Sequence, residues 1–210
     1  MWTTGGPSDI AMHPLTFFLL SAFALVALGD HLNADGKKTC LREHNNYRRQ
    51  LAAGRVKNGA GQSMPKAANM NEIKYSKDLE AKAQQWATSC PGMKHTPNIG
   101  YGQNLYWTSQ QVDQATALRQ ATQAWWNEVK LYRNTNLKLT SAVFNLGVGH
   151  FTQMAQAKNT KVGCSVQSCS GTYVVCNYDG QNFLNQPIYR KGAKCSKCEG
   201  GRKCSNGLCK

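Results

Sequence analysis

Gly149-His150-Phe151-Thr152-Gln153-Met154 is the stretch that decides the fold of this chain. It has the pattern of a short helix, and two β-type runs follow it, at residues 161–167 and 172–179, around a tight turn at 168–171. The runs and their turn carry Cys164, Cys169 and Cys176. A histidine on a helix that is backed by a cysteine-rich hairpin indicates an imidazole held at the floor of a groove.

Hydrophobic periodicity predicts three longer helices ahead of this stretch. They are expected over residues 40–53, from the N-cap Ser76 to Cys90, and over about 112–132. Residues 72–75 form a candidate strand, while 54–69, 91–104 and 134–147 are expected to be loops. Helices and strands interleave without βαβ regularity. The expected fold class is therefore α+β, with helices on both faces of a small, mainly antiparallel sheet.

The amino end has the features of a targeting segment. Residues 15–28 are an apolar run with the length of a signal-peptide core, too short to span a bilayer comfortably. Small residues at 27–29 predict a signal peptide over 1–29, cleaved before Asp30. Met12 is a second candidate initiator, which would make residues 1–11 an upstream extension. A secreted, extracellular protein is expected, with a retained membrane anchor as the alternative.

Cysteine usage agrees with an oxidising compartment. The chain has nine cysteines, none of them in the leader, so a disulfide framework with one unpaired thiol is expected. Residues 190–210 form a separate hinge-like tail with four cysteines, seven Lys or Arg and one Glu. Because this tail has almost no apolar side chains, disulfides must give it shape.

The charge of the chain is strongly basic. The formal net charge is +14, and the basic residues do not gather into a helix stripe. No zinc-finger or RNA-binding motif is present, so nucleic acid is not an expected partner. A basic soluble surface without a dedicated partner is one interpretation; attraction to anionic glycans or membrane surfaces is the other.

Two segments also resemble the signatures of a known family. The stretch at 149–154 and Val174-Val175-Cys176-Asn177-Tyr178 are similar to the paired motifs of the CAP family (cysteine-rich secretory proteins, antigen 5, pathogenesis-related 1; also SCP/TAPS). The resemblance covers residues 40–189 and implies an α-β-α sandwich. Residues 186–189 and the four-cysteine tail look most like nematode venom-allergen-like and activation-associated secreted proteins.

The resemblance favours particular disulfides. Cys164 and Cys176 lie on neighbouring predicted strands, and Cys90 can reach Cys169, so both bridges are geometrically feasible, and similarity to the family favours them. The pairing of the tail cysteines stays open: Cys195, Cys198, Cys204 and Cys209. The Cys195-x-x-Cys198 spacing also suits zinc, although an oxidising compartment argues against it. Cys40 is left over, which allows a monomer or a Cys40-linked dimer.

The resemblance also implies a groove tetrad, formed here by His95, Gln103, Glu128 and His150. In relatives the set is two histidines and two glutamates, so Gln103 replaces a carboxylate with a neutral amide that cannot balance a cation. His95 and His150 are the candidate ligands for weak zinc or magnesium binding, and no cofactor is required. The supporting residues that match the family are Asn104, Thr152 and Gln153.

Three functions are compared on these residues. The first is a secreted effector that binds host extracellular proteins or receptors, modulates immunity and holds a sterol or fatty acid. The second is a metal-dependent hydrolase or protease built on His95 and His150. No motif places a serine or cysteine nucleophile nearby, and Gln103 removes a candidate base, so the chain is not expected to be an enzyme. The third, a channel-blocking toxin, lacks the longer cysteine-rich domain of such relatives.

Overall fold

A computed structural model describes residues 1–2 and 31–210 of the chain. The predicted leader over 1–29, with its possible extension over 1–11, falls almost wholly on residues 3–30 and lies outside the described part. Within the described part, no helix is both long enough and apolar enough to cross a membrane.

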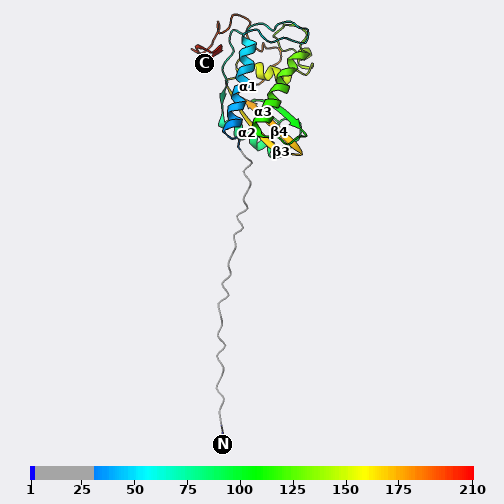
Figure 1. The fold of residues 1–210 in the computed structure, drawn as a ribbon, viewed down its shortest axis with the longest axis vertical. Helices are drawn as coiled ribbons and strands as arrows, with labels where there is room; N and C mark the ends of the chain where they lie inside the picture. The colour runs from blue at the N-terminus through cyan, green and yellow to red at the C-terminus, as the bar shows by residue number, and fades with distance from the viewer. Residues whose placement is uncertain (3–30) are drawn as a thin grey trace.

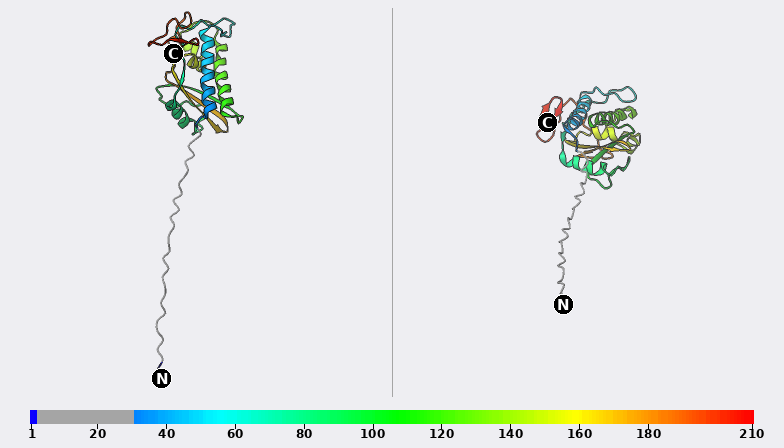
Figure 2. Two further views of the ribbon diagram at one scale, coloured as in Figure 1. Left: turned by 60° about the vertical axis from the view of Figure 1, so that its left-hand side comes forward. Right: turned by 60° about the horizontal axis from the view of Figure 1, so that its bottom comes forward.

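Three layers build the domain, as Figures 1 and 2 show. The middle layer is a four-stranded sheet in the order β1-β3-β4-β2, in which only the β1–β3 pair is parallel among the described strands. Helix α2 (Lys77–Ala87) covers one face, and α1 (Ala34–Ala52), α3 (Gln114–Asn127) and α5 (Gly149–Ala155) cover the other. The predicted α+β sandwich with a mainly antiparallel sheet is confirmed. The strands are β1 (Lys74–Tyr75), β2 (Gly102–Thr108), β3 (Lys161–Cys169) and β4 (Gly171–Tyr178).

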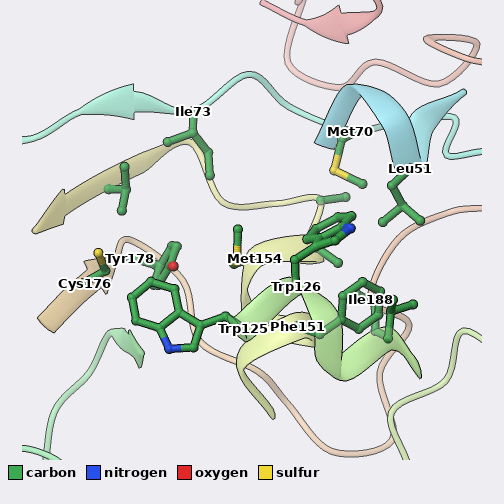
Figure 3. Packing of buried hydrophobic residues seen from close by; sticks show 14 of the residues in the cluster. Leu51, Met70, Ile73, Trp125, Trp126, Phe151, Met154, Cys176, Tyr178 and Ile188 are labelled. Atoms are coloured by element: carbon green, nitrogen blue, oxygen red, sulfur yellow. The ribbon is translucent and has the colours of Figure 1, made fainter. Parts of the chain in front are cut away.

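Strand β4 lies at the centre and is buried along its whole length. Its residues alternate between two cores: Tyr173 and Val175 pack beneath α2, while Val174, Cys176 and Tyr178 pack beneath α1 and α3. The larger core also holds Trp125, Trp126 and Phe151, seen together in Figure 3. Burial on both faces explains why this strand is apolar on both sides.

Helix α1 begins earlier than periodicity predicts. Asn33 caps it, because its side chain accepts a hydrogen bond from the Gly36 N–H at 2.7 Å. The first turns bury Gly36 and Thr39, which are small and not apolar, so no hydrophobic pattern marks them. Helix α2 has the predicted cap at Ser76 but ends at Ala87, ahead of Cys90.

Two elements fall where loops or a longer helix are expected. Strand β2 begins with Gly102, Gln103 and Asn104 inside a predicted loop, since buried polar side chains hide its strand pattern. The third helix stops at Asn127 and continues as the 3-10 turn η1 (Glu128–Leu131). A short helix, α4 (Ser141–Phe144), also lies in a predicted loop.

The disulfides agree with the expected framework. Cys90–Cys169 and Cys164–Cys176 are both present, and the tail pairs Cys195 with Cys204 and Cys198 with Cys209. The zinc alternative for Cys195-x-x-Cys198 is therefore wrong in this structure, because all four tail thiols are bonded. Cys40 is free and has no exposed surface, so a Cys40-linked dimer would require the core to open.

The tail docks on the domain instead of standing apart from it. Its hairpin of β5 (Cys204–Ser205) and β6 (Leu208–Cys209) buries Leu208 and Cys209. The Cys209 N–H donates to the Met70 carbonyl and the Cys209 carbonyl accepts from the Glu72 N–H. The end of the tail thus contributes apolar burial and backbone hydrogen bonds as well as disulfides.

A buried arginine joins α1 to the segment that follows α5. The Arg48 guanidinium is fully buried and donates to five backbone carbonyls, at 2.8 to 3.3 Å: Asn71, Met154, Gln156, Ala157 and Asn159. Desolvation by burial lowers the pKa of Arg48 to about 9. The carbonyls replace the water that the charge loses.

Arg48→Lys should lower the free energy of unfolding by about 3 kcal/mol, because an ammonium has three donors and leaves buried carbonyls without partners. Chemical denaturation followed by circular dichroism measures the change. The control is Arg42→Lys on the same helix, where an exposed pair with Glu43 should change stability by less than about 0.5 kcal/mol. Equal effects of the two substitutions would contradict this role of Arg48.

Candidate functional site: a central polar groove

The groove is a hollow of about 530 Å³ between the sheet edge and α5. All four residues of the predicted tetrad line it: His95, Gln103, Glu128 and His150. They come from four places in the chain, namely the loop after α2, strand β2, the start of η1 and the first turn of α5. The fold therefore brings together residues that sequence spacing alone does not connect.

His150 is oriented by Glu128. The His150 Nδ1 lies 2.6 Å from Glu128 Oε1, and Glu128 Oε2 accepts from the Phe151 N–H at 2.9 Å. The Nδ1 atom of His150 donates to the Glu128 carboxylate. The Nε2 atom of His150 has no protein partner among the described residues. Helix α3 ends at Asn127, and the 3-10 turn η1 that follows it places Glu128 beneath the first turn of α5.

Gln103 orients His95 in the same way, with an amide in place of a carboxylate. The backbone N–H of Thr96 donates to Gln103 Oε1 at 3.0 Å, which fixes which end of the amide carries the oxygen. His95 Nδ1 lies 3.2 Å from the same oxygen and must donate to it. The Gln103 Nε2 atom donates to Thr96 Oγ1 and Asn177 Oδ1, at 2.9 and 3.0 Å. Every polar atom of the amide is thus hydrogen-bonded.

A chain of buried hydrogen bonds connects α1 to the backbone of His150. The Cys40 carbonyl can only accept, so His44 donates to it from Nδ1 at 2.8 Å and accepts from the Tyr178 hydroxyl at Nε2, also at 2.8 Å. Asn104 Nδ2 donates to Tyr178 Oη at 3.3 Å and to the His150 carbonyl at 3.1 Å. Asn104 therefore holds the His150 backbone from below the groove.

The other two supporting residues fasten α5 to the loop after β4. Gln153 Nε2 donates to the Gly180 carbonyl at 2.6 Å, and Gln153 Oε1 accepts from the Asn182 N–H at 3.2 Å. Thr152 Oγ1 accepts from Asn182 Nδ2 at 2.9 Å. A Cβ at position 102 would meet the amide end of the Gln153 side chain, so a larger residue there would require Gln153 to leave its hydrogen bonds.

Two further hollows adjoin the groove. One, of about 280 Å³, shares Glu128 and His150 with it and is lined mainly by Met93, Leu105, Trp107 and Trp125. The other, of about 580 Å³, shares Gln181 and is lined by residues within 180–190, among them Phe183, Leu184 and Ile188, and by Asn69 and residues 156–159. Phe183 and Leu184 are 56% and 50% exposed. Apolar surface thus lies on both sides of the polar centre.

The groove offers few ligands to a metal ion. Zinc sites in proteins use three or four protein ligands. Within the described part of the chain, no three ligating atoms of His, Cys, Asp or Glu that lie within 4.8 Å of one another come from the groove. Two imidazole nitrogens are available, while both oxygens of Glu128 already accept hydrogen bonds. The residues present do not fit a tight metal site.

Sequence reasoning missed several groove residues. Thr96 and Asn177 complete the bonding of Gln103, and Asn182 fastens Thr152 and Gln153. Asn177 lies within the family motif at 174–178, and this position could have identified it as a groove residue. His44 is fully buried and belongs to the chain of hydrogen bonds beneath the groove.

The fold and the groove define a class of disulfide-bonded α-β-α proteins with a histidine-lined central cavity. Residues 41–178 match the model of the cysteine-rich secretory protein family, CAP. The "Ancylostoma secreted protein" of Ancylostoma caninum is 37% identical over 82% of this chain and 43% of its own length. "Venom allergen 5" of Polistes dominula is 33% identical, covering 74% of this chain and 72% of the relative. The crystal structure of NaASP2 with Zn²⁺ has a TM-score of 0.81 at 38% identity, covering 86% of this chain and 98% of that one.

The chain belongs to the CAP family, with venom-allergen-like and nematode secreted proteins among its relatives. It spans less than half the length of the Ancylostoma caninum protein that it matches.

Stability should depend on pH through His44. Desolvation by burial lowers the pKa of His44 to about 4, so this imidazole stays neutral in the fold while the unfolded chain takes up a proton near pH 6.5. The unfolded state then binds more protons, and the free energy of unfolding should fall by about 3 kcal/mol between pH 6.5 and 4.

Denaturant titrations at several pH values measure this fall. His44→Gln should have a shallower dependence on pH than the native chain. His31→Gln, at an exposed histidine whose ring lies 3.8 Å from the Glu80 carboxylate, is measured for comparison. An unchanged slope in His44→Gln would assign the pH dependence to other groups.

Proposed function

We propose that this chain is a secreted binding protein that acts on host extracellular proteins or receptors and modulates immunity. The observation that carries the proposal is the bonding of the groove. Its imidazoles are held in fixed tautomers by Glu128 and Gln103, with both Nε2 atoms directed away from these partners. Fixed donors and acceptors in a preformed hollow suit recognition, and the volume lies in the usual range for ligand sites.

Hydrolysis is the second candidate, and the same bonding argues against it. Among the described residues, neither groove histidine hydrogen-bonds a serine, threonine or cysteine that could act as a nucleophile. Glu128 is committed to His150 and to the backbone of Phe151, and Gln103 is no base. Zinc-dependent turnover of a peptide or ester that disappears in His150→Ala would favour the hydrolase.

Weak divalent-metal binding is part of the proposal. The related NaASP2 was crystallised with Zn²⁺. In this chain the ligands would be His95 and His150, and an amide at Gln103 supplies no negative charge.

Gln103→Glu should bind zinc more tightly than the native chain, because a carboxylate strengthens His95 as a ligand and balances the cation. Calorimetric titration with zinc measures both proteins. His95→Ala is the control that should abolish the gain. Tighter binding by the native chain would contradict the proposal. Thermal denaturation of Gln103→Glu is measured alongside, because the new carboxylate would face Asn177 Oδ1.

A sterol or fatty acid is the proposed apolar ligand, and the hollow after β4 suits it best. Four large apolar side chains of α3 and η1 are almost wholly buried in the core: Leu118, Trp125, Trp126 and Val129. The hollow lined by Phe183, Leu184 and Ile188 has a volume of about 580 Å³, and these apolar side chains share its wall with polar residues such as Gln156, Lys158 and Arg190. The smaller hollow beside His150 lies below the usual range for ligand sites.

Leu184→Asp should abolish binding of a fluorescent fatty acid or sterol, because it places a charge on an apolar wall. The matched control is Leu131→Asp, which changes a leucine with 43% exposure outside this hollow and should bind as the native chain does. Native mass spectrometry of the secreted protein gives a second readout, since a retained lipid adds its mass. Equal binding by both variants would exclude this hollow.

A further inference from the structure

Three sulfur atoms meet in the core beneath the groove. The Cys40 Sγ on α1 lies 3.2 Å from the Cys164 Sγ on β3, which is bonded to Cys176 on β4. The three sulfurs lie within 4.8 Å of one another, and none of the three residues is exposed. The free thiol is thus in contact with a disulfide instead of lying apart from it.

This contact defines the chemistry open to Cys40. External thiols and oxidants cannot reach a residue with 0% exposure in the closed fold. The other eight cysteines are paired, and Cys164 carries the disulfide sulfur that Cys40 contacts. Thiol–disulfide exchange needs an attacking sulfur beside a disulfide sulfur, and both are present here.

We propose that Cys40 is an internal exchange partner of the Cys164–Cys176 disulfide, so that the chain has two interchangeable disulfide isomers. The Cys40 thiolate attacks Cys164 Sγ and forms a Cys40–Cys164 bond. The Cys164–Cys176 bond breaks, and Cys176 leaves as a thiolate that takes up the proton Cys40 gave up. One bond forms and one breaks, so no oxidant or reductant is consumed.

The exchange moves a covalent link between layers of the fold. The first isomer closes the β3–β4 hairpin, with a sequence separation of 12, whereas the second joins α1 to β3. Cys176 pairs in register with Asn104 on β2, and its neighbour Asn177 pairs with Gln103. The released thiol therefore lies on the strand that supports the groove.

The closed fold restrains the exchange. Desolvation by burial raises the pKa of the Cys40 thiol, and the charge of Glu80 raises it further. The other titratable groups that face Cys40 are His44 on α1, at 3.9 Å from its sulfur, Tyr75 on β1 and Tyr178 on β4. Because the thiolate is the nucleophile, the rate should increase with pH and with opening of α1 from the sheet.

The first test uses two variants with eight cysteines each. In Cys176→Ala the sulfurs of Cys40 and Cys164 should form the second isomer's bond, so that the secreted protein has no free thiol and peptide mapping finds Cys40–Cys164. The matched control, Cys40→Ala, should also have no free thiol but keep Cys164–Cys176. Two free thiols in a folded Cys176→Ala would overturn the proposal, as would a covalent dimer.

The second test uses the native chain and does not depend on the folding of a variant. The protein is held without reductant at pH 7, 8 and 9, quenched in acid, unfolded, and alkylated at its free thiol. Label should move from Cys40 to Cys176 at a rate that increases about tenfold per pH unit. Label that stays on Cys40 at every pH would overturn the proposal, and so would label spread equally over all nine cysteines.

Discussion

The rest of this structure depends on one buried charge, the guanidinium of Arg48. It donates to carbonyls at the end of α5 and in the segment that follows it, within residues 154–159, and to Asn71 ahead of β1. Met154 lies in the last turn of α5 and the other carbonyls in irregular backbone, where regular helix and sheet hydrogen bonds do not satisfy them. A single planar group with several donors gathers them at one point, so the end of α5 is fixed relative to α1.

The position of the groove follows from that constraint. Helix α5 is short, and its side chains in the groove would be poorly placed if its end were free. Arg48 holds the end, while Glu128 holds the beginning through the Phe151 N–H and the His150 ring. From the same helix as Arg48, His44 reaches Tyr178 and through it Asn104, which binds the His150 carbonyl. Helix α1 thus supports the groove by two independent buried routes without lining it.

The parts of the fold and groove that could be predicted are those whose contacts are visible in the local sequence pattern. The motif at 149–154 and the alternating runs after it predict α5 and the hairpin, because these features are local, whereas the two disulfides, one with a sequence separation of 79, are favoured by the family resemblance. Arg48 looks like an ordinary surface charge on a helix, since nothing nearby in sequence reveals its carbonyl partners. Strand β2 is missed for a related reason: Gln103 and Asn104 are polar residues whose buried partners lie far along the chain. Long-range satisfaction of polar groups is therefore the information that periodicity does not contain.

Gln103 shows how far the groove is adapted to its own residues. In sequence alone, Gln103 is a substitution that removes one of the two carboxylates of the family tetrad. In the fold it accepts from His95 and the Thr96 N–H and donates to Thr96 Oγ1 and Asn177 Oδ1. A carboxylate has no donor, so it would place an oxygen against Asn177 Oδ1 and require that amide to turn. Asn177 Nδ2 in turn donates to the Leu79 carbonyl of α2, so the change would extend to that helix. The amide is thus part of a bonded set that joins the groove to α2, and this favours a groove shaped for neutral hydrogen-bonding recognition over one built to balance a cation.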